Sequence, residues 1–346
     1  MIGAFSHSVG HRFSFIFRNE TSMYKKLFSL FLSFAAVTGV QQAAHAADNY
    51  PTRPLRIVVA STAGSTPDVL ARILGEALGA RLKQAVIVEN KAGAGGVLGT
   101  DSVAKAAPDG YTLGIGHDGT MAINTLLYKD LPYNPVRDFA AIAPLALNEF
   151  VLIAHPSTGV RSFSDFIAFT KKEDGKATYA SAGVGTPNHV FMEQLMQAIG
   201  VKMVHIPYRG GAAAVSDVAG GQVQFMLAGI APALGQIKGK RVTALAVVQS
   251  KRAAILPDVP TMGETLPGFA LKTWFGLFAP AKTNPDVIAR INKEVQEILA
   301  KPEIREKLSA QGMMVETGSA AALSELVLSD IKRYENLSKQ IKLEAN

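Results

Sequence analysis

Strand-like and helix-like segments alternate along most of this 346-residue chain, and this alternation limits the possible folds more than any other feature. Short apolar runs predict strands, and the segments between them carry apolar residues at helical spacing. Repeated β–α units of this kind place strands side by side in a sheet with helices on both faces. The sequence therefore predicts an α/β fold with mixed, mainly parallel sheets.

The strand and helix predictions cover most of the chain after residue 50. The predicted strands are 55–60, 86–89, 111–116, 150–154, 178–180, 204–207, 223–227 and 242–248. The predicted helices are 67–82, 97–106, 122–127, 164–171, 187–199 and 212–219. Three more helices are predicted near the C-terminus, because Pro285, Pro302 and Ser319 are typical of helix starts.

The first 46 residues predict a leader that is separate from this fold. Lys25 and Lys26 precede an apolar stretch over 27–40, and Ala44-His45-Ala46 is typical of a signal-peptide cleavage site. The apolar stretch is too short to span a bilayer. We expect translation to begin at Met23, and the mature chain to begin at Ala47. Its predicted location is the periplasm, as a soluble protein without a membrane anchor.

Composition narrows the classes of partner and chemistry. The leader contains four of the 35 basic and one of the 28 acidic residues, so 31 bases and 27 acids leave a mature net charge of +4. The basic residues are dispersed, which favours a small anionic ligand over nucleic acid. The absence of cysteine excludes disulfides and thiol chemistry. The histidines lack metal-ligand spacing, so we expect no metal. We also expect no cofactor, and a monomeric protein.

Two segments share a plan that is typical of helix starts. AGSTPDVLARILGEALG (63–79) and AGVGTPNHVFMEQLMQAIG (182–200) each contain Ala-Gly, then Thr-Pro, then apolar residues at helical spacing. Thr66 and Thr186 are the predicted N-caps, and Pro67 and Pro187 the first helical residues. First-turn amides have no partner within a helix, and the helix dipole adds positive charge, so both loops suit a carboxylate or phosphate. The alternative is two ordinary capped helices.

Side chains and amides near these loops are candidates for ligand binding. Asp68 either complements the helix dipole or meets a ligand ammonium, hydroxyl or water, and His189 has either a structural or a ligand role. The stretch 114–119 matches GxGxxG without the acidic residue expected about 20 positions later, so it predicts a turn with Thr120 and Asn124 facing a cleft. The predicted ligand-binding residues are Ser61, Thr62, Gly64, Ser65, Thr66, Asp68, Thr120, Asn124, Ser181, Ala182, Gly183, Gly185, Thr186 and His189.

No catalytic set is predicted, because the chain has neither a zinc-protease HExxH motif nor a Gly-x-Ser-x-Gly elbow. Arg209 is expected either at the surface or beside a ligand carboxylate. Trp274 and Phe275 are expected either in the core or along a cleft.

Longer segments resemble a known family. They are YPTRPLRIVV (50–59), ENKAGAGGVLGTDSVAKAAPDGYTLGIG (89–116), LPYNPVRDFAAIAPL (131–145), YASAGVGTPNHV (179–190), IPYRGGAAAVSDVAGGQVQFML (206–227), LPDVPTMGE (256–264) and TWFGLFAPAKTNPDVIARIN (273–292). Through them nearly all of the mature chain resembles the Bug-type periplasmic substrate-binding proteins of tripartite tricarboxylate transporters.

The resemblance implies a two-lobed, type II Venus-flytrap fold, with lobe one at 49–149 plus 275–346 and lobe two at 150–274. It also implies a ligand between the lobes, whose carboxylates are held largely by backbone N–H groups of loops 61–68 and 181–189. Family members usually have an aromatic residue and Gly-Gly in the first loop, where this chain has Ser61 and Gly64-Ser65. The departure implies a ligand that is larger or differently shaped.

The expected function is capture of a mono-, di- or aromatic carboxylic acid by lobe closure, followed by transient contact with membrane transporter subunits. One alternative is a sensor that presents the carboxylate to a signalling receptor. The other is a periplasmic hydrolase that uses Ser65 or Ser181 with His189 and Asp68.

Overall fold

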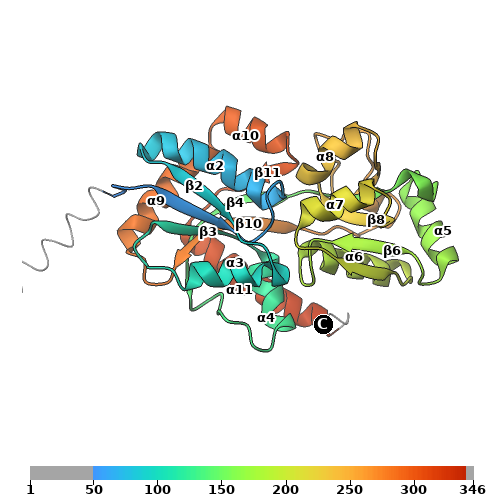
Figure 1. The fold of residues 1–346 in the computed structure, drawn as a ribbon, viewed down its shortest axis with the longest axis horizontal. Helices are drawn as coiled ribbons and strands as arrows, with labels where there is room; N and C mark the ends of the chain where they lie inside the picture. The colour runs from blue at the N-terminus through green and yellow to red at the C-terminus, as the bar shows by residue number, and fades with distance from the viewer. Residues whose placement is uncertain (1–49, 340–346) are drawn as a thin grey trace, which may run out of the picture. The chain divides into compact units, whose positions relative to one another are not determined.

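A computed structural model describes residues 50–339, and these residues form two β-sheets surrounded by helices (Figure 1). The six-stranded sheet has the order β11-β4-β10-β3-β1-β2 and belongs to the first lobe. The five-stranded sheet has the order β7-β6-β8-β5-β9 and belongs to the second lobe. The predicted two-lobed α/β fold is therefore confirmed, whereas the predicted leader and its start at Met23 lie outside the described residues.

Parallel and antiparallel pairs meet in the sheet of the first lobe. Its strands are β1 (Leu55–Val59), β2 (Val86–Asn90), β3 (Thr112–His117), β4 (Phe139–Asn148), β10 (Thr273–Pro280) and β11 (Met313–Val315). β1 pairs in parallel with β2 and β3, as the β–α alternation predicts. β10 pairs antiparallel with β3 and β4, and β11 pairs antiparallel with β4. The sequence analysis did not predict β4 or β11.

The sheet of the second lobe is buried on both faces. Its strands are β5 (Phe150–Ala154), β6 (Thr178–Ser181), β7 (Val204–Pro207), β8 (Phe225–Gly229) and β9 (Thr243–Val247). β6 is parallel to β7 and β8, and β5 is antiparallel to β8 and β9. In the two sheets of residues 50–339, five of the nine strand pairs are antiparallel, so the sheets are mixed as predicted but not mainly parallel. Side chains alternate between the faces, because Leu152 packs in one core cluster and Val151 and Ile153 in the other. Helices therefore cover both faces of this sheet.

The helices begin where the sequence signals place them, within a few residues. Asn284 caps the Asp286 amide at 2.8 Å, and Ser319 caps the Ala322 amide at 3.1 Å. The helix 230–238 was not predicted. The α-helices are α2 (Thr66–Leu82), α3 (Val97–Ala104), α4 (Asn124–Leu127), α5 (Phe163–Glu173), α6 (Pro187–Ile199), α7 (Gly211–Ala219), α8 (Ile230–Lys238), α9 (Pro285–Leu299), α10 (Pro302–Ser309) and α11 (Ala320–Ser338).

The last helix, α11, is fastened to the strands that carry the site. Tyr334 donates its hydroxyl hydrogen to Asp118 Oδ2 at 2.6 Å, and Thr273 donates to the other oxygen of Asp118. Trp274 donates its indole N–H to Asp330 Oδ2 at 2.6 Å and is buried, so it belongs to the core. Burial raises the pKa of Asp118 to about 6, against the opposing hydrogen bonds from Thr273 and Tyr334.

The chain passes from the first sheet to the second at Glu149 and returns before Thr273. Glu149 joins both lobes through its backbone, since its N–H donates to Gly312 O and its carbonyl accepts from Ile230 N, each at 3.0 Å. Between residues 50 and 339 no helix is both long and apolar enough to cross a bilayer.

Candidate functional site

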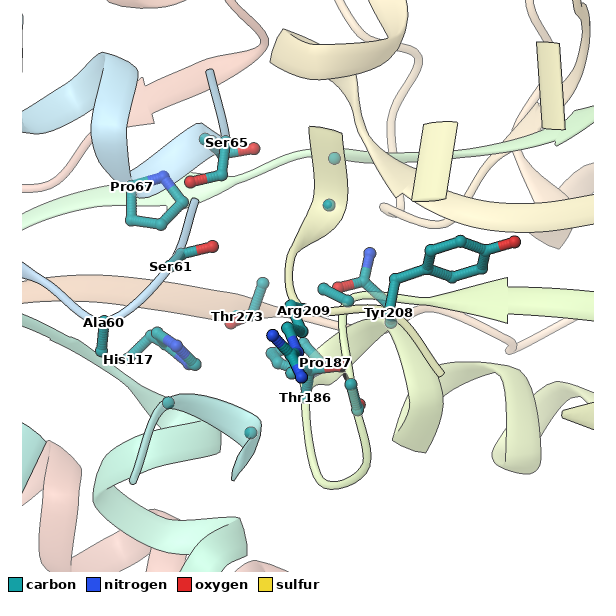
Figure 2. Close-up of a pocket in the computed structure, with 18 of the residues that line it drawn as sticks. Ala60, Ser61, Ser65, Pro67, His117, Thr186, Pro187, Tyr208, Arg209 and Thr273 are labelled. Atoms are coloured by element: carbon teal, nitrogen blue, oxygen red, sulfur yellow. Dashed lines mark hydrogen bonds between the residues drawn. The ribbon is translucent and has the colours of Figure 1, made fainter. Parts of the chain in front are cut away.

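A cavity of about 300 Å³ lies between the two lobes, and residues of both form its walls (Figure 2). Figure 2 shows Ser61, Ser65 and His117 on the side of the first lobe, opposite Tyr208 and Arg209 of the second lobe. Thr273 lies between the two groups. The aromatic residues Tyr128, Phe150 and Phe275 add apolar wall to the cavity.

The first loop, 61–68, folds back on itself before α2. Gly64 has a φ of 76°, which favours glycine, and the chain then turns into the helix at Ser65. The Ser65 hydroxyl donates to Thr62 O at 2.6 Å, and the Gly64 amide donates to Asp68 Oδ2 at 2.8 Å. The observed N-cap is thus Ser65, one residue before the predicted Thr66, because the positive φ at Gly64 sets the turn.

The Asp68 side chain is bonded to its own loop and to neighbouring residues, and it holds this loop in place. It accepts from Arg72 Nε and from Asn90 Nδ2, each at 3.0 Å, and Asn90 Nδ2 also reaches Ser61 O at 3.2 Å. Burial pushes the pKa of Asp68 upward, but the hydrogen bonds from Arg72, Gly64 and Asn90 bring it below its ordinary value. Asp68 therefore stays ionised with its partners supplied by the protein.

The second loop, 181–189, has the same backbone plan. Gly185 has a φ of 77°, Thr186 is the N-cap as predicted, and its hydroxyl donates to Gly183 O at 2.6 Å. The Gly185 amide donates to His189 Nδ1 at 3.3 Å, so this ring also holds its loop from within. Ser181 is buried; its hydroxyl accepts from the Gly183 amide at 3.1 Å and contacts His205 Nε2 at 2.6 Å.

Three rings are stacked beneath the second loop. The ring centroids of His189 and His205 are 4.2 Å apart, and those of His205 and Tyr179 are 4.8 Å apart. Burial, together with the neighbouring His205, lowers the pKa of His189 to about 3. Burial lowers the pKa of His205 to about 4. Both imidazoles are therefore neutral near pH 7, and the loop carries no cationic side chain of its own.

Helix N-termini converge on the cavity from both lobes. The first residues of α2 and α6 line it, as do Gly211 at the start of α7 and Gly229 just before α8. Within residues 50–339 the backbone N–H groups of Ser61, Thr66, Ala182 and Asn188 have no hydrogen-bond partner. Such unpaired amides at helix starts give a site that attracts anions.

The charge of the cavity wall agrees with this arrangement. Among the described residues that line the cavity, Arg209 is the only one with a formal charge, and none is Asp or Glu. Its guanidinium is exposed and makes no ion pair within residues 50–339. An anion in the cavity therefore meets amides and a free cation, without a carboxylate to repel it.

His117, at the end of β3, offers the cavity one defined hydrogen-bond donor. Its Nδ1 accepts the Gly119 amide at 3.0 Å, and burial lowers its pKa to about 4. In the neutral ring the proton must then lie on Nε2, the remaining nitrogen. His117 also packs edge-to-face on Phe275, with ring centroids 6.1 Å apart.

Glycines allow the lobes to approach each other closely around the cavity. A Cβ at Gly95 would overlap the carbonyl oxygen of Val184, and a Cβ at Gly229 would overlap Thr66 Oγ1. Gly229 has a φ of −59°, which any residue adopts, so space alone accounts for glycine there.

The predicted site residues fall into two groups. Ser61, Ser65, Thr66, Ala182, Gly183 and Thr186 line the cavity. The other eight do not line it: Thr62, Gly64, Asp68, Ser181, Gly185 and His189 lie within the two loops, and Thr120 and Asn124 are buried after β3. Asn124, for example, donates to Gly95 O and to Tyr133 Oη, each at 3.3 Å, and so supports the turn 93–96.

Several cavity residues were not among the predicted binding residues. His117 and Asn148 lie at the ends of β3 and β4, and Gly93 to Gly96 form the turn before α3. Strand ends are where ligands bind in α/β folds, so the end of the predicted strand 111–116 was the usable signal for His117. The hydrolase set is not assembled, since Ser181 meets His205 and Asp68 is bound to Arg72. Within residues 50–339 no cluster of His, Asp and Glu could hold a metal ion.

Comparison with known proteins relates the chain to a family. The family model described as "Tripartite tricarboxylate transporter family receptor" matches residues 70–343. A relative from Pseudomonas sp. (strain P51), named "UPF0065 protein in tcbD-tcbE intergenic region", is 35% identical over 313 residues, which are 90% of this chain and 93% of the relative.

Solved structures agree with the family match. The periplasmic binding protein BugD is 34% identical with a TM-score of 0.82, and the match covers 86% of this chain and 100% of BugD. Rpa4515 of R. palustris, solved with adipate, is 29% identical with a TM-score of 0.82, over 84% and 97% of the two chains. MatC from Rhodopseudomonas palustris, solved with bound malate, is 32% identical with a TM-score of 0.78, over 83% and 99%.

Proposed function

Because the chain belongs to the tripartite tricarboxylate transporter receptor family, we propose that it captures a small organic carboxylate between its lobes and delivers it to a membrane transporter. The family is one of solute-binding receptors and not of enzymes. Adipate in one relative and malate in another support a carboxylate as the ligand. The same relationship supports a periplasmic location for this chain.

The observation that carries the proposal is the set of unpaired amides in the two loops and at the starts of α2 and α6, which belong to residues that line a cavity without acidic side chains. Hydrogen bonds to a charged group contribute about 1.5–3 kcal/mol each. A micromolar dissociation constant requires about 8 kcal/mol. Four such amides and Arg209 can provide this after the cost of fixing ligand and lobes is subtracted.

Binding is coupled to closure in this proposal. The moving bodies are the two lobes, with boundaries near residues 149–150 and 274–275, and the protein acts as a monomer. A ligand that touches amides of both lobes stabilises the closed arrangement over the open one. Ser61, Ser65, Thr66, Ala182, Gly183, Thr186 and the Asn188 amide are the proposed contacts, and Asp68 and His189 hold the loops.

Calorimetry with matched ligands tests the carboxylate. The purified protein is titrated with a panel of mono-, di- and aromatic acids, and each acid that binds is compared with its neutral amide, for example adipate with adipamide. We expect the acids to bind and their carboxamides not to bind, because only a carboxylate is strongly attracted to the backbone N–H groups of the cavity wall. Binding of no acid, or equal binding of acid and amide, contradicts the proposal. Loss of uptake of that acid on gene deletion tests delivery to a transporter.

A further inference from the structure

Asn148 carries an unpaired polar group at the edge of the cavity. The residue ends β4, lines the cavity and is only 6% exposed. Its Oδ1 has no hydrogen-bond partner in the described part of the chain. A buried carbonyl without a partner costs about 1–3 kcal/mol. A side chain that bears this cost while lining a ligand cavity points to a partner that the ligand supplies.

Thr66 presents a second polar group to the same place. It begins α2, is 5% exposed and lines the cavity. The position that a Gly229 Cβ would occupy overlaps Thr66 Oγ1 and lies 3.6 Å from both amide atoms of Asn148. The two side chains of the first lobe therefore face one glycine of the second lobe.

Gly229 permits this close approach of the two lobes. Its backbone conformation suits any residue, so a side chain is excluded there by Thr66 Oγ1, while the Asn148 amide atoms lie at ordinary contact distance. Gly229, Thr66 and Asn148 all line the cavity.

The chemistry of the pair selects the ligand group. Asn148 offers a carbonyl oxygen that needs a donor and an NH2 group that donates, and Thr66 offers a hydroxyl that both donates and accepts. A carboxylate oxygen only accepts, so it can bind the NH2 group and the Thr66 hydroxyl but leaves the Asn148 carbonyl unpaired. A methylene group satisfies neither side chain. A ligand hydroxyl donates to Asn148 Oδ1 and accepts from Thr66 Oγ1, and so pairs both.

We propose that Asn148 and Thr66 form a subsite for a hydroxyl group of the ligand, so that the protein prefers hydroxy acids to deoxy acids of the same carbon skeleton. This inference rests on the proposed function, since the amides at the starts of α2 and α6 bind the carboxylate while Asn148 and Thr66 bind the hydroxyl group.

Matched acid pairs test the subsite. Calorimetry compares malate with succinate, lactate with propanoate, and mandelate with phenylacetate, in the wild type and in Asn148→Leu and Thr66→Val, which remove the polar groups at similar volume. In at least one pair we expect the hydroxy acid to bind about tenfold more tightly in the wild type, as for one or two added hydrogen bonds. Asn148→Leu and Thr66→Val should each bring that ratio to about one, mainly through weaker binding of the hydroxy acid.

Thr170→Val provides a matched control, because Thr170 is equally buried but its hydroxyl donates to Phe166 O in α5, away from the cavity. We expect it to retain the hydroxy-acid preference. Equal binding of both acids in every wild-type pair overturns the subsite, and so does an equal loss of both acids in the two variants, which indicates a structural role. If deoxy acids bind without a hydroxyl preference, the subsite alone fails. If no acid binds the wild type, the proposed function fails and the subsite with it.

Discussion

Asp68 and His189 occupy equivalent positions in the two loops, where each accepts the amide hydrogen of the glycine four residues earlier. The distances are 2.8 Å from Gly64 N to Asp68 Oδ2 and 3.3 Å from Gly185 N to His189 Nδ1. A carboxylate in one loop and a neutral imidazole in the other thus act as the same kind of hydrogen-bond acceptor. By pairing the glycine amide, each side chain fixes the curvature that leaves the next helix start facing the cavity.

Asp68→Asn should weaken ligand binding and lower stability. An amide accepts through one oxygen only, so it cannot keep the bonds from Gly64, Arg72 and Asn90 together. We expect a loss of about 1–3 kcal/mol in the free energy of unfolding, and weaker binding of every acid. Urea unfolding and calorimetry measure the two effects. Arg72→Gln is the control, because it leaves the Gly64 bond in place; an affinity loss as large as that of Asp68→Asn would contradict this account.

The stacked histidines predict a dependence of stability on pH. In the folded protein the pKa values of His189 and His205 are lowered to about 3 and about 4 by burial, with His205 adding to the shift of His189, against an ordinary 6.5. Between pH 6.5 and 4 the unfolded chain therefore binds more protons, and the free energy of unfolding falls as the pH falls. The double variant His189→Gln with His205→Gln should lose less stability over this window than the wild type. Equal slopes in urea unfolding at several pH values would refute the assignment.

Gly229→Ala should hinder closure of the lobes. Its Cβ would overlap Thr66 Oγ1, and the backbone itself is not strained. We expect binding of a deoxy acid to weaken by about tenfold, which corresponds to about 1.4 kcal/mol, with little change in unliganded stability. Adding Thr66→Ala removes the obstructing oxygen and should restore affinity. Gly235→Ala in α8 meets no neighbouring atom and should bind as the wild type does. Unchanged affinity in Gly229→Ala would show that closure does not bring these atoms together.

Arg209→Gln should weaken acid binding without changing stability, because the exposed guanidinium has no ion-pair partner among residues 50–339. We expect a loss of about three- to tenfold that diminishes as salt is added, since exposed charges are screened. Arg209→Lys, which keeps the charge, should retain most of the affinity. The measurement is calorimetry at two salt concentrations. A loss of affinity that does not depend on salt would indicate that the Arg209 side chain acts through its shape and not through its charge.

Local signals in the sequence predicted the parts of the fold that depend on neighbouring residues. Pro187, Pro285 and Ser319 mark helix starts because their chemistry suits the first helical turn, and the structure places helices there. The equivalence of the two loops was predicted one residue out of register. The sequence analysis aligned the Thr-Pro pair of one loop with that of the other. In the structure the glycines with positive φ, Gly64 and Gly185, are equivalent, and the N-cap follows each of them directly.

The rest of the site depends on contacts between distant segments. A side chain in the first helical turn can face the ligand or its own loop, and only Asn90, 22 residues further along, shows that Asp68 faces inward. Asn148 reaches the cavity at the end of β4, which pairs antiparallel with β10 and was not predicted. Antiparallel pairing of distant strands leaves no local pattern from which this position could be read.

The link from α11 through Asp118 to Thr273 has a practical consequence for anyone who builds a biosensor from this chain. Removing the terminal helix before Tyr334 would leave the buried Asp118 carboxyl group without one of its two hydroxyl partners, and the remaining partner, Thr273, lines the cavity. A fluorescent reporter is therefore better inserted in an exposed turn than grafted in place of that helix.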